Sequence, residues 1–264
     1  MNILSNRPNI LFVIWVRNKQ FNFIFNYKLK RHIYYLKLTN ALTTIKTGVE
    51  AGIKFKNWKV NGRRHRDDGP AWIRGISKEN PNGTEYYYYI NGKLHRGLSQ
   101  DGKVRPARIY GISNENPNGT SHEYFINGKR HREDGPAWIR RISNENPNGT
   151  EHEYYKHGKL HRGLSQDGKV EPACIYHIST ENPNGTSHEY FIHGKRHRDD
   201  GPAYITGISK ENPNGTYHCY YQHGKSHRDD GPAIIFGITK NNPNGIKHYY
   251  YKNGENIYHP LFKN

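Results

Sequence analysis

The sequence has little of the material from which a compact aliphatic core is built. It contains 2 Cys and 1 Met, only 33% of its 264 residues are hydrophobic, and its 21 Tyr outnumber its 9 Phe and 4 Trp combined. A core of Leu, Val and Met is therefore disfavoured. Tyrosine instead suits a partly solvated sheet, on which the ring is covered while the hydroxyl stays in water.

Cysteines and apolar runs are equally scarce, and each shortage excludes a class of protein. Two cysteines, Cys174 and Cys219, cannot form a disulfide framework, so we expect free thiols in a reducing compartment. The apolar run at residues 10–16 has seven residues, far short of the roughly 20 that span a bilayer. Basic and polar residues 17–20 follow it in place of a small-residue cleavage site. We therefore expect no transmembrane span, no secretion and a cytoplasmic location.

Positive charge is concentrated near the N-terminus. The formal net charge is +17, and residues 1–57 contribute +9 of it through ten Lys or Arg and one acid. The most basic stretch interleaves cations with tyrosines: Lys28, Lys30, Arg31, Tyr34 and Tyr35. This pattern favours an anionic partner, nucleic acid or a phospholipid surface, because Tyr stacks on bases or lies at a lipid interface. A solvated, solubilising face is the equal alternative.

The composition changes near residue 56, which divides the chain into two parts. Residues 1–57 form a basic, aromatic N-terminal segment. Its runs at residues 10–16 and 21–27 predict buried strands that cap the array, and residues 39–52 predict a short helix. Residues 58–264 form a repeat array, whose atypical tail at residues 257–262 we expect to cap the other end.

The second part repeats one unit that is marked by a His-Arg pair. Six such pairs begin at residues 65, 95, 131, 161, 197 and 227, so the spacing alternates between 30 and 36 residues. The longer steps carry a six-residue insertion, because residues 97–106 and 163–172 replace the short Asp-Asp-Gly-Pro of residues 67–70. The resulting 66-residue superperiod indicates duplication of a two-unit block.

Each unit predicts a β-hairpin and a further strand. Asn-Gly or His-Gly, as at residues 91–92 and 157–158, follows an aromatic pair and favours a type I′ hairpin, which needs positive φ at both turn positions. A second strand starts after Gly-Pro, as at residues 71–76, where proline is tolerated. The sequence therefore predicts an all-β fold, an elongated single-sheet array of antiparallel β-hairpin repeats with about 30 residues per unit. Thirteen or so strands would form a ribbon roughly 60 Å long.

Side chains alternate across the first strand of each unit. His122 and Tyr124 share one face, and Glu123 and Phe125 share the other. We expect stacked aromatic ladders on both faces, with neutral imidazoles between tyrosine rings. The alternative is a pH-responsive histidine column.

The aromatic-aromatic-x-Asn/His-Gly-Lys hairpins of residues 56–257 resemble MORN-type repeats, in the variant class with a Tyr-x-x-Asn-Gly-Lys core. The unit is longer than the usual MORN unit, and His-Arg-Asp-Asp-Gly-Pro-Ala at residues 65–71 is not its ordinary signature. The His-Arg/Gly-Pro-Ala array also resembles those of uncharacterised proteins of large DNA viruses and phages. The resemblance implies an elongated antiparallel sheet that contacts proteins or phospholipids, in the host cytoplasm if the source is a virus.

The His-Arg pairs invite a catalytic or metal-binding interpretation, which their repetition disfavours. Zinc needs three or four convergent ligands, and catalysis needs one unique constellation with separated roles. We expect no enzyme, no metal and no cofactor, with Arg pairing with the turn Asp or lying over a Tyr ring. The structural residues of the repeat are its turn glycines and its pairs: Gly92, His95, Arg96, Gly128, His131, Arg132, Gly158, His161, Arg162, Gly194, His197 and Arg198.

Function is expected where the units differ. The two long loops recur on alternate units and should project from the same edge of the array. Their candidate interaction residues are Leu98, Gln100, Asp101 and Lys103, then Leu164, Gln166, Asp167 and Lys169. The sequence thus predicts a non-catalytic repeat scaffold that mediates protein-protein interaction. Binding of anionic partners through the N-terminal segment is the alternative, and uncapped sheet ends favour a homodimer.

Overall fold

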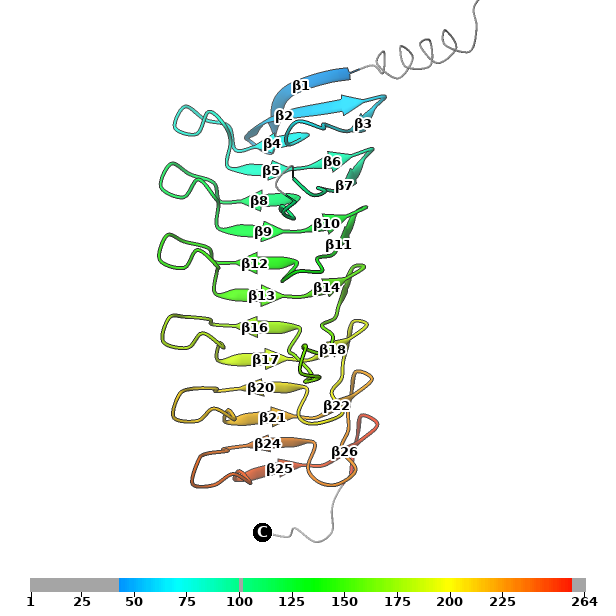
Figure 1. Cartoon of the computed structure of the whole chain (residues 1–264), viewed down its shortest axis with the longest axis vertical. Coiled ribbons are helices and arrows are strands. Elements are labelled where there is room, and N and C mark those ends of the chain that lie inside the picture. Colours follow the sequence, from blue (N-terminus) through cyan, green and yellow to red (C-terminus); the bar gives the residue numbers. More distant parts are fainter. Residues whose placement is uncertain (1–42, 100–101, 258–264) are drawn as a thin grey trace, which may run out of the picture. The chain divides into compact units, whose positions relative to one another are not determined.

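One long antiparallel sheet dominates the structure. The computed structural model describes residues 43–99 and 102–257, which form 27 strands and no helix. Fourteen strands follow one another along the sheet from top to bottom in Figure 1, and the two-residue β3 (Arg63–Arg64) pairs with the second of them. The fourteen are Thr43–Glu50 (β1), Ile53–Val60 (β2), Trp72–Arg74 (β4), Glu85–Tyr87 (β5), Arg108–Tyr110 (β8), Ser121–Glu123 (β9), Trp138–Arg140 (β12), Glu151–Glu153 (β13), Cys174–Tyr176 (β16), Ser187–Glu189 (β17), Tyr204–Thr206 (β20), Tyr217–Cys219 (β21), Ile234–Phe236 (β24) and Lys247–Tyr249 (β25). The predicted all-β hairpin array is confirmed.

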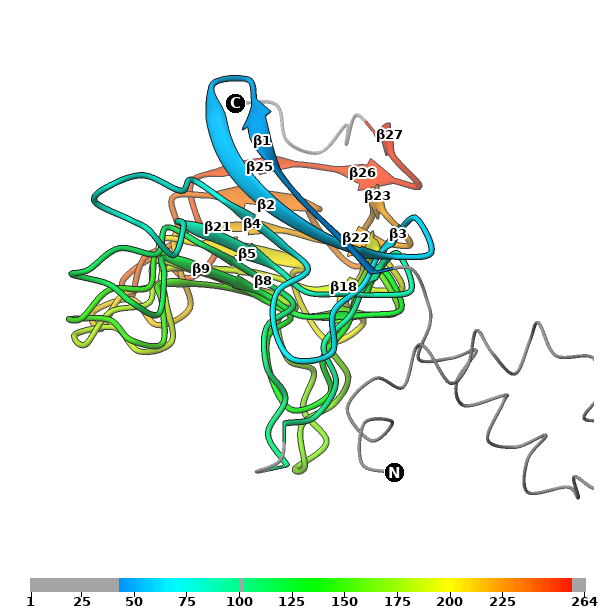
Figure 2. The ribbon, with the colours of Figure 1, turned by 90° about the horizontal axis from the view of Figure 1, so that it is seen from above.

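Each unit also carries a small hairpin that leaves the sheet, which we call its arm hairpin (Figure 2). The φ angles of Asn91 and Gly92 are 50° and 80°, and those of His157 and Gly158 are 51° and 86°. Both turn positions therefore have the positive φ that a type I′ turn requires. The arm hairpins are Tyr89–Ile90 (β6) with Lys93–Leu94 (β7), Phe125–Ile126 (β10) with Lys129–Arg130 (β11), Tyr155–Lys156 (β14) with Lys159–Leu160 (β15), Phe191–Ile192 (β18) with Lys195–Arg196 (β19), Tyr221–Gln222 (β22) with Lys225–Ser226 (β23), and Tyr251–Lys252 (β26) with Glu255–Asn256 (β27).

The first strand of each unit bends where a continuous strand was predicted. In the second superperiod β9 ends at Glu123, and β10 begins at Phe125. The N–H of Tyr124 donates to the carbonyl of Ala137 in the sheet, while its own carbonyl accepts from the N–H of His131 in the arm hairpin. Pro136, which precedes Ala137, has no N–H with which to extend the sheet ladder. The strand therefore changes partners at the tyrosine.

The core is thin and follows the bend. The alanine after each Gly-Pro or its equivalent is fully buried, which leaves no space for a longer side chain. The isoleucine that precedes the connecting loop is buried in three units, at Ile142, Ile208 and Ile238. The six buried alanines are Ala71, Ala107, Ala137, Ala173, Ala203 and Ala233.

The expected aromatic ladder on the histidine face is wrong. Ile139 of β12 pairs with His122 of β9 on one side and with His152 of β13 on the other. The same alternation recurs at Ile175 and Ile205. Because every second strand of the sheet presents isoleucine at this register position, the imidazoles are separated by aliphatic side chains and do not stack between tyrosines.

Two further expectations were tested by the described residues. The short helix at residues 39–52 is wrong, because residues 43–50 form strand β1. Its β-branched side chains, among them Thr44, Ile45 and Val49, favour an extended backbone. The two cysteines, Cys174 and Cys219, are free as expected, and both are buried.

Candidate functional site

The histidine of each His-Arg pair joins its own unit to the turn of the next unit. Nδ1 of His131 accepts a hydrogen bond of 3.1 Å from the backbone N–H of His157, and Nδ1 of His95 accepts one of 3.1 Å from Asn127. The same bond, 3.0 to 3.3 Å long, is made by the other four histidines, His65, His161, His197 and His227. The histidine side chain of each pair thus contributes a hydrogen bond between repeats.

This bond requires a neutral imidazole. An Nδ1 that accepts cannot carry a proton, so Nε2 is the protonated nitrogen and donates, as from His131 to Glu133 at 2.9 Å. Where the turn residue is histidine, the two rings also stack, with centroids 4.6 Å apart for His131 and His157. Burial lowers the pKa of His161, and His193 and Lys156 lower it further. At His161 the folded protein therefore favours the neutral form that the bond needs.

The arginine of every pair lies over an aromatic ring, and in the four units with the short turn it also pairs with the turn aspartate. The guanidinium of Arg132 lies 4.1 Å from the ring centroid of Tyr124, and its Nε donates to Asp134 at 2.7 Å. Across the six units the distance to the ring ranges from 3.7 to 4.3 Å. The hydrogen bond with Arg132 holds the pKa of Asp134 below its usual range. The pairs therefore close the turn beside the bend.

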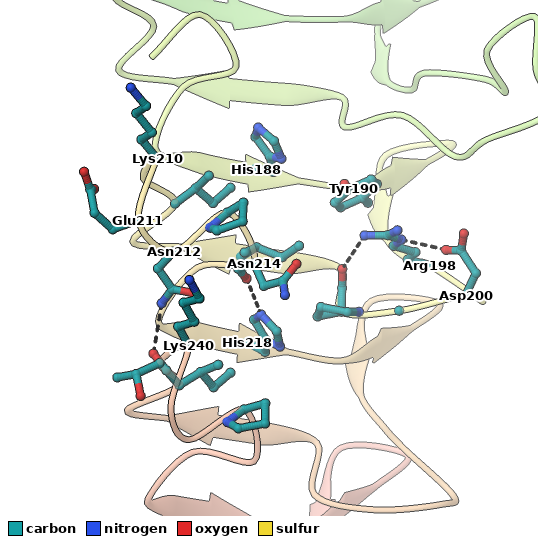
Figure 3. A pocket seen from close by; sticks show the side chains of 18 residues that line it. His188, Tyr190, Arg198, Asp200, Lys210, Glu211, Asn212, Asn214, His218 and Lys240 are labelled. Atoms are coloured by element: carbon teal, nitrogen blue, oxygen red, sulfur yellow. Dashed lines mark hydrogen bonds and ion pairs between the residues drawn. The ribbon is translucent and has the colours of Figure 1, made fainter. Parts of the chain in front are cut away.

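A hollow lies beside these turns on the histidine face (Figure 3). Its volume is about 690 Å³, and it is lined by strands, by the Gly-Pro turn and by two connecting loops. His188 and His218 lie on its strand floor, with Arg198 and Asp200 at one end and Lys210 at the other. The two histidines occupy equivalent positions in successive repeats, three residues after the glycine of each Asn-Pro-Asn-Gly connection.

Each of these histidines is hydrogen-bonded to the connecting loop that precedes it. Nε2 of His218 lies 2.6 Å from the carbonyl oxygen of Asn214, and Nε2 of His188 lies 2.6 Å from that of Asn184. Burial is the largest cause that lowers the pKa of both imidazoles. A neutral ring that donates to a backbone carbonyl cannot serve as a general base through that nitrogen. The two histidines of the hollow are therefore already bonded through Nε2 to their own connecting loops.

In residues 43–99 and 102–257, no three His, Cys, Asp or Glu side chains converge as metal ligands would. Over the same ranges, no helix is long and apolar enough to cross a membrane.

The two long loops present the candidate residues that the sequence singled out. Leu98 and Leu164 are 71% and 67% exposed, although each forms a β-bridge within its loop, to Val104 and Val170 respectively. Figure 2 shows both loops projecting from the same side of the sheet, in teal-green and yellow-green. An exposed leucine held by a bridge differs from one on an irregular tip, because its position is fixed. These two leucines are the best-defined exposed apolar features of the loops.

The other candidate residues of the loops that the structure describes are charged or polar and exposed. Nζ of Lys169 lies 2.7 Å from Asp167, and this hydrogen bond holds the pKa of the Asp167 carboxyl below its usual range. Gln166 and Lys103 are exposed. Gln100 and Asp101 lie outside the described residues, as do Lys28, Lys30, Arg31, Tyr34 and Tyr35 of the basic stretch.

Charged clusters on the opposite face were missed by the sequence reasoning. Glu123, 2% exposed, accepts from Nε of Arg130 at 2.7 Å, and its other oxygen lies 3.3 Å from Arg108. The ring of Trp138 is sandwiched between Arg130 and Arg140, each 4.2 Å from its centroid. The recurring Glu of the first strand, at residues 123, 153 and 189, was the available signal. Its partners could be found only from the register between strands.

Comparison of the chain with protein-family models, with curated proteins and with solved structures finds no match.

Proposed function

We propose that the chain is a non-catalytic repeat scaffold that binds a protein partner through its two long loops. The observation that carries this proposal is the pair of exposed, bridged leucines, Leu98 and Leu164, on one side of the sheet. Exposed leucines add little to the stability of the chain itself, and burying them against a partner is favourable. The MORN-type resemblance, which implies protein or phospholipid contacts, agrees with this role.

The spacing of the loops defines the partner. The first loop precedes β8 and the second precedes β16, four strand positions further along the sheet. At about 4.8 Å per strand, the loops repeat every 19 Å or so. A partner with two apolar pockets at that spacing binds both leucines at once. Because the two contacts are linked, its affinity is higher than that of either contact alone.

The test is an affinity capture with the intact protein, comparing the wild type with the double variant L98D/L164D. We expect the partner to be retained by the wild type and lost from the double variant. The matched control is I246D, because Ile246 is 78% exposed but lies near β25, far along the sheet from both loops. Equal recovery with all three proteins would contradict the proposal.

Binding of an anionic partner through residues 28–37 is the second candidate, and the +9 charge of residues 1–57 favours it. Mobility-shift and liposome-sedimentation assays at two salt concentrations test it, because screening weakens such contacts as salt rises. Absence of binding to both nucleic acid and anionic vesicles at low salt rejects this candidate.

We also propose a cytoplasmic location, supported by the free thiols. Burial raises the pKa of Cys174 to about 12, so its thiolate is scarce at neutral pH. Fractionation of expressing cells tests this location directly.

A further inference from the structure

Three arginines recur at the 66-residue superperiod and point to a site in the first copy. One is in β3 of the main sheet, and the other two are in arm hairpins. Arg64, Arg130 and Arg196 each end the second strand of a hairpin. Each guanidinium lies over the aromatic ring at the start of the next sheet strand, as Arg64 does over Trp72 at 4.0 Å and Arg130 over Trp138 at 4.2 Å. The three positions are structurally equivalent.

In the second and third copies a glutamate neutralises this arginine. Nη2 of Arg130 lies 2.6 Å from Glu123, and Nη2 of Arg196 lies 2.6 Å from Glu189. The register explains the pairing, because Glu123 is opposite Trp138 and Glu189 is opposite Tyr204. The carboxylate therefore comes from the strand beside the aromatic ring.

The first copy has lost this carboxylate. Asn57 of β2 is opposite Trp72, at the register position where Glu123 is opposite Trp138. Phe55 similarly replaces Ser121. These two differences remove the glutamate that would pair with the arginine and the hydroxyl that would accept from the indole, as Ser121 accepts from Trp138 Nε1 at 3.1 Å.

Around Asn57, three buried polar atoms have no hydrogen-bond partner within the described residues. They are Nε of Arg64, Nε1 of Trp72 and Oδ1 of Asn57, whose side chain belongs to a residue that is only 6% exposed. Buried polar groups without partners cost free energy, so such a cluster calls for an occupant. In the second copy the equivalent Arg130 Nε and Trp138 Nε1 are both satisfied.

All three residues line one cavity of about 340 Å³ at this end of the sheet. Lys46 and Lys59 also line it, and Glu50 is the only acidic side chain among its lining residues. The formal charge of the lining is therefore +2 when Arg64 is included. An anion is favoured over a cation or a neutral group.

We propose that this cavity binds a carboxylate group, which replaces the missing glutamate. One carboxylate accepts from Arg64 Nε and Trp72 Nε1, and an N–H or O–H beside it donates to Asn57 Oδ1. Two sources supply such a group: a small free carboxylic acid, or an acidic side chain of a bound peptide. Residues 1–42 of the chain contain no Asp or Glu, so that segment has no side-chain carboxylate to offer.

The indole N–H resonances of the full chain provide the test. We expect the Trp72 signal, assigned with W72F, to shift saturably when acetate or N-acetylglycine is added at constant ionic strength. The Trp138 signal is the internal control and should stay in place, because its N–H already donates to Ser121. Chloride at the same ionic strength controls for general anion effects.

A peptide arm distinguishes the two sources. A capped peptide with one glutamate, compared with its glutamine counterpart, should shift Trp72 at lower concentration than acetate if a partner side chain is the occupant. If acetate or N-acetylglycine saturates first, a small acid is the occupant. If no carboxylate shifts Trp72, or if chloride shifts it equally, the cavity holds only water or adventitious ions and the proposal is overturned.

The variant N57E keeps the proposal testable without any loss of structure. It rebuilds the Glu–Arg pair of the second copy, so it should fold and should abolish the carboxylate-dependent shift by occupying the cavity. An unchanged shift in folded N57E would place the carboxylate elsewhere and refute the assignment. Because the long loops are untouched in this variant, capture of a partner through Leu98 and Leu164 remains a separate measurement.

Discussion

The backbone N–H of His157 donates to Nδ1 of His131, which lies 26 residues earlier in the chain and in the preceding unit. Bonds of this kind join successive arm hairpins wherever a His-Arg pair occurs. The His-Arg pairs, which resembled a catalytic cluster in the sequence, therefore hold successive repeats together.

Lowering the pH should destabilise the fold. Burial lowers the pKa of His161, and of His122, His152, His188 and His218, below the unfolded value of about 6.5. Below about pH 6.5 the unfolded chain therefore binds more protons than the folded chain. The contribution of these histidines to the free energy of unfolding is fully present above about pH 6.5 and is lost as the pH falls through the folded pKa values. Thermal unfolding followed by circular dichroism should show a lower Tm at about pH 5.5 than at about pH 7.5. A Tm that is constant or rises on acidification contradicts this expectation.

Removing the imidazole of one His-Arg pair should lower the free energy of unfolding measurably. In H131A the N–H of His157 loses its acceptor and the stacked ring is removed, so we expect a loss of about 1–3 kcal/mol in the free energy of unfolding. The control H177N changes an exposed histidine with a φ of 57°, which asparagine tolerates, and should stay within about 0.5 kcal/mol of the wild type. Urea denaturation of the three proteins gives the comparison.

Alanine substitutions at two glycines should distinguish the cost of backbone strain from the cost of steric conflict. Gly149 and Gly168 both have positive φ, 71° and 78°. A Cβ at Gly149 would lie 2.5 Å from the carbonyl oxygen of Arg140, whereas one at Gly168 would meet nothing within 4 Å. We expect G168A to cost about 1–2 kcal/mol from the left-handed conformation alone, and G149A to cost clearly more. Equal urea midpoints for the two variants would show that the connection relaxes around the new methyl group.

Truncating a buried carboxylate should destabilise the opposite face. E123A leaves Arg108 and Arg130 without their shared counter-ion, and loss of one partner from a buried pair costs about 3–5 kcal/mol. E115A, at an exposed position with no salt bridge to a described residue, should change stability by less than about 0.5 kcal/mol. Calorimetric Tm values distinguish the two outcomes, and similar values for both variants would argue against a structural role for the cluster.

The sequence predicted the features that are encoded locally. The two-residue turns at Asn91-Gly92 and His157-Gly158 specify their own φ angles, so the arm hairpins could be located without knowledge of any distant residue. The contacts of Arg132 with Tyr124 and Asp134 also lie within one unit. The candidate role of the loops in binding stays a prediction.

Features that depend on register between units could not be read from the sequence. The bend at Tyr124 requires the carbonyl of Ala137 from the following strand. The alternation of His122 with Ile139 appears only once β9 and β12 are aligned. The carboxylate site is a further case, because the meaning of Asn57 emerges when its pairing with Trp72 is compared with that of Glu123 and Trp138.

The bond from the turn N–H of one unit to the imidazole of the unit before it always runs in the same direction along the chain. Each interior unit thus presents one donor edge and one acceptor edge that match those of every other unit. A block of 66 residues can be inserted or removed at such a boundary without creating a new kind of contact. The number of repeats can consequently change, in evolution or by engineering, while the contacts between neighbouring repeats stay the same.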